Sequence, residues 1–149
     1  MIKFSKKIEY ALGTLQYLGL HPKTSFSAKE LANTLNIPYE FLSKTLAQLA
    51  KSNILISNQG MKGGYQLAVL PKDLKFSQIL EALNEPINVV ECASGDEEIC
   101  ERSNICLIKS PMFQLQMKIN ELIGSTTLED LLKLIKEDSQ NQNVKQVVG

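Results

Sequence analysis

Residues 27–51, SAKELANTLNIPYEFLSKTLAQLAK, contain the pattern that decides the fold. Ser27 and Glu30 have the spacing of a capping box, in which each side chain accepts a hydrogen bond from a backbone N–H at the start of a helix. This spacing predicts a short helix that begins after Ser27 and stops near Asn36.

Pro38 suits the first turn of a second helix, which we expect to run from Tyr39 to about Lys51. Its leucines recur at helical spacing and leave most polar residues on other faces; they are Leu42, Leu46 and Leu49. Two short helices joined by a tight turn predict a helix-turn-helix.

Two short stretches with strand patterns follow, at residues 54–56 and 65–69, and the turn-rich run SNQGMKGG lies between them. A hairpin directly after a helix-turn-helix predicts a winged helix. The glycines lack the G-x-x-x-x-G-K-[ST] order of a phosphate-binding loop, which disfavours a nucleotide site. We therefore expect a mainly α fold with a small β-hairpin, in which a long dimerisation helix follows the winged helix-turn-helix.

The first twenty residues place apolar side chains at helical spacing, at Ile8, Leu12, Leu15 and Leu18. Lys6 and Lys7 ahead of apolar residues weakly imitate a signal peptide, but Glu9 and Gln16 interrupt the apolar run. The chain has no apolar stretch of the roughly 18 residues that a membrane span needs. We expect a folded amphipathic helix in a cytoplasmic protein with no membrane partner.

The remaining helical patterns lie in the second half of the chain. Residues 76–84 predict a short helix, and residues 111–123 carry apolar side chains on more than one face. A helix of the latter kind needs two partners, which we expect to be its own domain and a second subunit. Thr126 and Glu129 repeat the capping-box spacing before a last helix.

These patterns divide the chain into four expected segments. They are a winged helix-turn-helix domain (1–84), a cysteine-containing sensor loop (85–110), the dimerisation and C-terminal helices (111–138) and a flexible tail (139–149).

The charges also divide the chain in two. Sixteen basic and sixteen acidic residues sum to zero, and such a balance by itself argues against a nucleic-acid partner. However, residues 1–80 hold ten lysines and four acidic residues, a net charge of +6, whereas residues 81–149 hold six basic and twelve acidic residues, a net charge of −6. The basic excess coincides with the predicted winged helix and indicates double-stranded DNA as the partner.

DNA affinity requires basic contacts to phosphates, and sequence reading requires side chains from an inserted helix. Candidate phosphate contacts are Lys6, Lys7, Lys29 and Lys62. Candidate base contacts on the second short helix are Tyr39, Glu40, Ser43, Lys44 and Gln48. The DNA-binding set is completed by Ser27, Asn58 and Gln59. One such module makes few contacts, so we expect a dimer that reads two half-sites.

The three cysteines, Cys92, Cys100 and Cys106, all lie within fifteen consecutive residues, in the spacing C-x7-C-x5-C. Such a cluster fits an iron–sulfur centre, a redox switch between two thiols, or zinc, although the paired C-x2-4-C ligands typical of zinc are absent. Incidental cysteines are the remaining alternative. Acidic neighbours oppose thiolate formation in the empty segment, and a bound cationic centre would reverse that effect.

In combination, these features resemble the Rrf2 family of bacterial regulators, which includes the IscR, NsrR and RirA types. The resemblance covers about residues 1–135 and rests on the helix-turn-helix, the wing GMKGGYQL at residues 60–67, the three-cysteine segment and the long helix. It implies a homodimer with crossed long helices that binds a palindromic operator. It also implies an iron–sulfur cluster, [4Fe-4S] or [2Fe-2S], that biases DNA affinity.

The resemblance carries the metal ligands over one position at a time. Cys92, Cys100 and Cys106 match the family's cluster cysteines, with a first spacer longer than the usual five residues. Lys109 occupies the position of the IscR-type histidine ligand, so that ligand is lost. Glu9 matches the acidic residue that the partner subunit supplies in NsrR-type proteins. In the wing, Gln59 stands where relatives often have an arginine, so operator preference cannot be copied from them.

The sequence therefore predicts a DNA-binding transcriptional repressor that senses iron–sulfur status, nitric oxide or redox state. One alternative is a cluster-free regulator of the same fold that responds to thiol oxidation or a protein partner. A second is an iron–sulfur electron carrier or enzyme. No acid/base pair, nucleophile–histidine arrangement or phosphate loop supports catalysis, so we expect no enzymatic activity.

Overall fold

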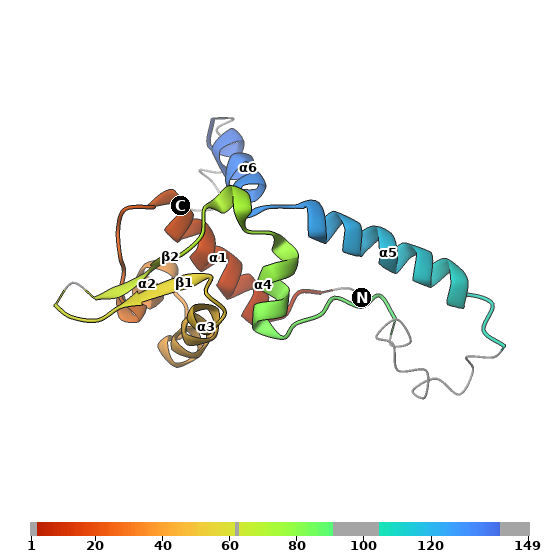
Figure 1. The fold of residues 1–149 in the computed structure, drawn as a ribbon, viewed down its shortest axis with the longest axis horizontal. Helices are drawn as coiled ribbons and strands as arrows, with labels where there is room; N and C mark the ends of the chain where they lie inside the picture. Colours follow the sequence, from red (N-terminus) through yellow and green to blue (C-terminus); the bar gives the residue numbers. More distant parts are fainter. Residues whose placement is uncertain (1–2, 62, 91–104, 141–149) are drawn as a thin grey trace.

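A computed structural model describes residues 3–61, 63–90 and 105–140 of the chain. Within these residues, six α-helices, one 3-10 turn and one two-stranded antiparallel sheet are present (Figure 1). In chain order they are α1 (Lys6–Leu20), α2 (Ala28–Leu35), α3 (Tyr39–Lys51), β1 (Leu55–Asn58), β2 (Gly64–Leu67), η1 (Pro71–Asp73), α4 (Phe76–Leu83), α5 (Lys109–Ser125) and α6 (Leu128–Gln140). This order confirms the predicted mainly α fold with a small β-hairpin. The hairpin lies at one end of the helical body, and α5 projects from the other end (Figure 1).

The helix-turn-helix forms as its local sequence predicts. The amide of Glu30 donates to Ser27 Oγ over 3.1 Å, and the amide of Ser27 donates to Glu30 Oε2 over 2.7 Å. Asn36 ends α2 in the left-handed conformation with φ of 53°, which asparagine tolerates better than most residues. Pro38 directly precedes α3. The capping box and both helix boundaries are therefore confirmed.

One hydrophobic core joins helices from both ends of the chain. Its fully buried leucines and isoleucines include Leu15 and Leu18 of α1, Leu42, Leu46 and Leu49 of α3, Ile79 and Leu83 of α4, and Leu128 of α6. The C-terminal helix α6 packs against α1, where Leu132 lies so close to Gly19 that a Cβ on the glycine would be 2.9 Å from the leucine Cδ1. Packing in the same core therefore ties α6 to the winged helix.

The hairpin pairs Leu55 with Leu67 and Asn58 with Gly64. Compared with the predicted stretches 54–56 and 65–69, β1 starts one residue later and extends to residue 58, while β2 ends at residue 67. Tyr65 also forms an isolated bridge with Phe26, through amide-to-carbonyl distances of 3.1 and 2.7 Å. This bridge fastens the wing to the segment that enters α2.

The start of α6 differs from the prediction by one residue. The capping pair is Thr127 and Asp130, since the amide of Asp130 donates to Thr127 Oγ1 over 3.2 Å and the amide of Thr127 donates to Asp130 Oδ2 over 2.9 Å. The predicted pair with Thr126 is therefore wrong. Thr126 instead ends α5, where both its amide and its hydroxyl donate to the Leu122 carbonyl.

The C-terminal end of α6 reaches residue 140, so it takes in the first two residues of the predicted tail 139–149. Residues 141–149, like residues 91–104 of the predicted sensor loop, lie outside the described residues. Among the helices that the structure describes, none combines the length and the apolar character needed to cross a membrane.

Candidate nucleic-acid interface and cysteine segment

The outer face of α3 carries the predicted base-contacting residues. Its leucines point into the core, so Tyr39, Glu40 and Lys44 are exposed on the opposite side, and Tyr39 retains half of its accessible surface. Ser43 and Gln48 are partly buried. The helix therefore presents hydrogen-bonding side chains near its N-terminal end, as a recognition helix requires.

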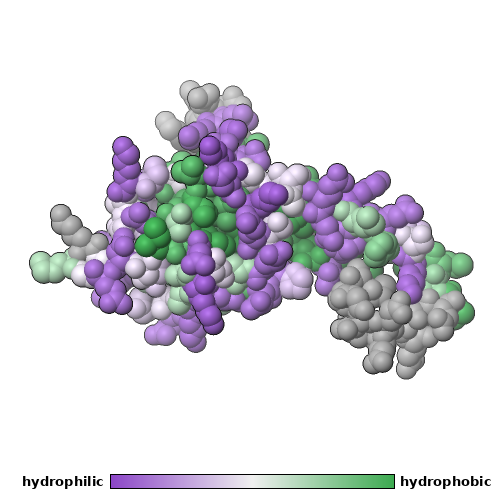
Figure 2. Space-filling model, viewed as in Figure 1, coloured by the Kyte–Doolittle hydropathy of each residue, from purple (hydrophilic) through white to green (hydrophobic). Residues whose placement is uncertain are grey.

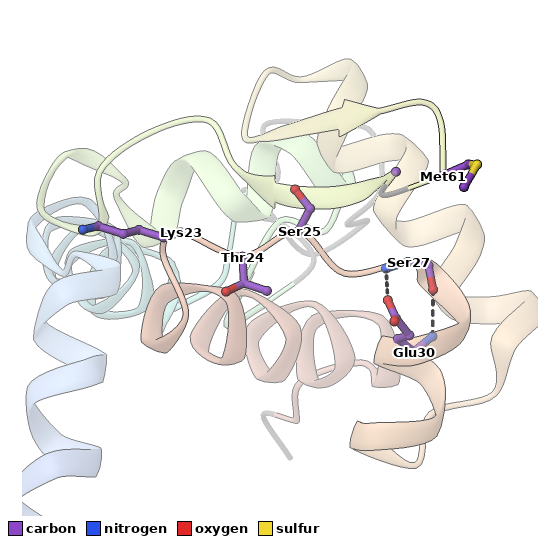
Figure 3. Close-up of a pocket in the computed structure, with 7 residues that line it drawn as sticks. Lys23, Thr24, Ser25, Ser27, Glu30 and Met61 are labelled. Carbon is purple, nitrogen blue, oxygen red and sulfur yellow. Dashed lines mark hydrogen bonds between the residues drawn. The ribbon is translucent and has the colours of Figure 1, made fainter.

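A polar pocket of about 560 Å³ lies between the start of α2, the loop after α1 and the tip of the wing (Figure 3). Its lining is rich in hydroxyl groups and consists of Lys23, Thr24, Ser25, Ser27, Glu30, Met61 and Gly63. Of these lining residues, Ser27 alone is among the DNA contacts that the sequence predicts. The hydroxyl-rich run KTSFS at residues 23–27 was the available signal, because hydroxyls next to a lysine suit a phosphate oxygen.

Side-chain hydrogen bonds hold the wing beside this pocket. Ser25 Oγ donates to Gln66 Oε1 over 2.8 Å and accepts from Asn58 Nδ2 over 3.2 Å. Asn58, a predicted DNA contact, therefore also anchors the wing at the point where β1 enters its tip. At the wing tip, Gln59 and Met61 are exposed, whereas Lys62 lies outside the described residues.

The predicted phosphate-contacting lysines near the N-terminus differ in their surroundings. Lys6 Nζ pairs with Glu9 Oε2 over 2.5 Å, and this hydrogen bond and the charge of Glu9 raise the pKa of Lys6. Lys7 Nζ donates to the Leu83 carbonyl over 2.7 Å and so joins α1 to the last turn of α4. This contact gives Lys7 a structural role that the sequence did not indicate. Lys29 is exposed on α2.

The structure describes two of the four predicted metal ligands, Cys106 and Glu9. Cys92 and Cys100 lie outside the described residues, whereas Cys106 is partly buried just before α5, where its carbonyl accepts from the Lys109 amide over 3.4 Å. Glu9 is exposed on the first turn of α1. Within the described part of the chain, no three histidine, cysteine or acidic side chains lie close enough together to hold a metal ion.

An exposed recognition helix, a hairpin wing anchored by hydrogen bonds, and a polar pocket between the wing tip and the start of α2 define a winged-helix DNA-binding protein. The sequence model of the Rrf2 family, described as an iron-dependent transcriptional regulator, matches residues 4–134. The chain therefore belongs to the Rrf2 family, as the motifs predicted, and members of this family are DNA-binding transcriptional regulators.

Individual relatives agree with this assignment. The chain is 28% identical over 125 residues to the HTH-type transcriptional regulator NsrR of Halalkalibacterium halodurans, covering 83% of this chain and 86% of that protein. The structure of T. potens IscR matches with a TM-score of 0.72 and 26% identity, over 92% of this chain and 90% of that chain. The structure of CymR, the global cysteine regulator of B. subtilis, matches with a TM-score of 0.67 and 27% identity, over 90% of this chain and 98% of that chain. These relatives are transcriptional regulators and not enzymes, in agreement with the prediction.

Proposed function

We propose that this chain is a homodimeric repressor that binds a palindromic operator, and that an iron–sulfur cluster on Cys92, Cys100 and Cys106 sets its operator affinity. The observation that carries the proposal is the extent of the family match. The model of a family described as iron-dependent matches residues 4–134, a range that includes the winged helix and the three cysteines.

The exposed apolar side chains of α5 support the homodimer. Phe113, Met117 and Leu122 each leave more than half of their surface accessible, and Figure 2 shows hydrophobic side chains at the surface of this arm. Exposed apolar surface of this kind is stabilised when another molecule covers it. A second copy of α5 would cover it symmetrically and would place two α3 helices for two half-sites.

The chemistry of the candidate ligands fits an iron–sulfur cluster. Cysteine thiolates are the usual ligands of such clusters, and a carboxylate is a weaker ligand that a small molecule can displace. Cys106 lies at the entrance to α5, and Glu9 is exposed where a partner subunit could approach it. Bound there, a cluster would supply redox chemistry and reactivity toward nitric oxide, and iron–sulfur status, nitric oxide and redox state are the proposed signals.

The energetic demand on the proposed switch is modest. A hundredfold change in operator affinity requires one state of the cysteine segment to favour the binding arrangement by roughly 2.7 kcal/mol. Because α5 projects from the winged helix, a small change in its angle would alter the separation of the two α3 helices in the dimer. Operators with fixed half-site spacing are sensitive to that separation.

The cluster is tested on protein purified without oxygen. We expect coloured protein that contains iron and acid-labile sulfide, and we expect Cys100→Ser to lose both. Asn104→Ser is the matched control, because it places a serine in the same segment and leaves all three thiols. Colourless protein without iron after reconstitution would remove the cluster from the proposal.

The DNA interface is tested by operator selection followed by affinity measurements at several salt concentrations. Lys44→Ala should weaken binding to the selected DNA more than binding to random DNA, because Lys44 is exposed on the face of α3 that carries the proposed base contacts. Lys133→Ala removes the same charge from α6 and should change neither affinity. If selection enriches no sequence and affinity hardly depends on salt, the operator-binding proposal fails.

The cluster-free alternative is favoured by one observation, the likeness to CymR, which is described as a cysteine regulator. In that case hydrogen peroxide would oxidise two of the thiols to a disulfide and would itself be reduced to two water molecules. Protein that lacks iron but changes its operator affinity on peroxide treatment, and recovers it with a dithiol reductant, would support this alternative.

A further inference from the structure

The side chain that α5 buries within the described structure is polar. Gln116 is 4% exposed, whereas the apolar residues of the same helix are exposed or partly buried. Its Oε1 accepts from the Val89 amide over 2.8 Å, and its Nε2 donates to the Ile87 carbonyl and to Asn120 Oδ1, each over 2.8 Å. The side-chain amide thus pairs with two backbone groups of a single segment, residues 87–89.

That segment connects the two halves of the molecule. Residues 87–89 follow α4, and Ile87 packs against the core of the winged helix. Cys92 comes three residues after Val89, and α5 begins three residues after Cys106. The Gln116 amide therefore joins the chain that enters the cysteine segment to the helix that leaves it.

A buried amide holds this junction differently from an apolar side chain. Hydrogen bonds are directional, so both bonds to residues 87–89 are retained only at one rotation and one position of α5 along its axis. Apolar contacts would allow α5 to slide or turn by small steps with little loss. Together with the packing of α5 against α4, the contact therefore helps to set the angle at which α5 leaves the winged helix.

We propose that Gln116 is a positioning residue that couples the state of the cysteine segment to operator affinity. The inference rests on the proposed function, in which that state controls DNA binding. Movement of the segment at residues 87–89 pulls directly on α5, and movement of α5 in the dimer is transmitted to the winged helix through the same two bonds. Within the described residues, the Gln116 side chain bonds to Ile87, Val89 and Asn120, none of which is a proposed DNA contact or metal ligand.

The test replaces Gln116 by glutamate and measures two quantities. Gln116→Glu keeps the shape but turns a second acceptor oxygen toward the Ile87 carbonyl, which repels it. Gln114→Glu is the matched control, since it makes the same change at an exposed position of the same helix. The first quantity is hydrogen exchange at the Val89 amide, and the second is the ratio of operator affinities between iron-loaded and iron-free protein.

We expect Gln116→Glu to speed Val89 exchange at least tenfold at neutral pH and to reduce the affinity ratio at least tenfold, relative to Gln114→Glu. Acidification protonates the new carboxyl group, which then donates to Ile87 and accepts from Val89 as the glutamine does. Val89 protection should therefore return at low pH, compared with the control at the same pH. Gln116→Met, which has no hydrogen-bonding group, should lose protection at every pH.

The outcomes separate this inference from the proposed function. If the variant lowers only the melting temperature and keeps the wild-type affinity ratio, Gln116 has a structural role and the coupling proposal is wrong. If wild type and Gln114→Glu themselves show no difference between iron-loaded and iron-free protein, the proposed function fails and the coupling fails with it. Val89 exchange reports on the contact in either case, and unchanged exchange in both Gln116 variants would refute the contact itself.

Discussion

Substitution of Gly64 by alanine gives a direct test of how the wing is attached. A Cβ at Gly64 would lie 2.5 Å from both the carbonyl carbon and the oxygen of Phe26, and 2.9 Å from the Ser27 nitrogen. These are backbone atoms, so no side-chain rotation can relieve the contact. The wing would have to move away from the entrance to α2 by roughly 1 Å to reach ordinary contact distances.

The magnitude follows from what that movement breaks. Steric overpacking costs about 1–3 kcal/mol, and each of the two backbone hydrogen bonds between Phe26 and Tyr65 contributes about 1 kcal/mol. We expect Gly64→Ala to lower the free energy of unfolding by about 3 kcal/mol. For a chain of this length, that corresponds to a fall in Tm of about 6–12 °C.

The assay is thermal unfolding followed by circular dichroism, at one fixed protein concentration because the proposed dimerisation would make the apparent stability depend on concentration. Gly13→Ala is the control, since an added Cβ at this position has no neighbouring atom within 4 Å. Within a helix, alanine is also more stable than glycine by about 0.5–1 kcal/mol. The control should be as stable as wild type or slightly more stable. Operator affinity should fall in Gly64→Ala alone, because the displaced wing and the pocket beside it lose their arrangement.

A Gly64→Ala protein that unfolds at the wild-type temperature would refute this reasoning. It would mean that the bridge between Phe26 and Tyr65 does not hold the wing. Unchanged stability with reduced operator affinity would place the glycine at the DNA surface and not at the packing contact.

Three further predictions concern other contacts of the same structure. Hydrogen bonds from the Thr127 amide, and secondarily from its hydroxyl, lower the pKa of Asp130. The stability that these bonds contribute is therefore present above the ordinary carboxyl pKa and is lost as the pH falls through the lowered value. The free energy of unfolding, measured against pH, should show this loss in acid for wild type and not for Asp130→Asn. If the proposed dimer forms through α5, Leu122→Lys should convert it to a monomer in analytical ultracentrifugation, whereas Leu134→Lys, at a similarly exposed position on α6, should leave the dimer intact. Ser27→Ala should lower the free energy of unfolding by about 1 kcal/mol through loss of the α2 cap and should also weaken operator binding, and equal operator affinity would remove Ser27 from the interface.

Much of the winged helix could be predicted because its signals are local. The capping box at Ser27 and Glu30 and the leucine spacing of α3 depend on residues three or four positions apart, so both can be recognised without knowledge of the tertiary structure. The distribution of charge and the spacing of the cysteines are likewise properties of the sequence alone. Together they were enough to indicate the family.

The start of α6 shows where a local signal is ambiguous. Thr126 with Glu129 and Thr127 with Asp130 both have the spacing of a capping box. The structure uses the second pair because Thr126 is already engaged at the end of α5 and because Thr127 bridges to Lys75. Local pattern alone cannot distinguish two adjacent registers when each offers a hydroxyl and a carboxylate.

The amino-acid sequence by itself determined the helix-turn-helix, the wing, the basic and acidic halves and the family of this protein. Only the tertiary structure decided that Lys7 holds α4, that Ser25 anchors the wing through Gln66, and that Gln116 holds the segment leading to the cysteines. These bonds join residues separated by 76, 41 and 27 positions. Periodicity and capping rules act over one or two helical turns, so contacts of this range appear only when packing brings distant segments together.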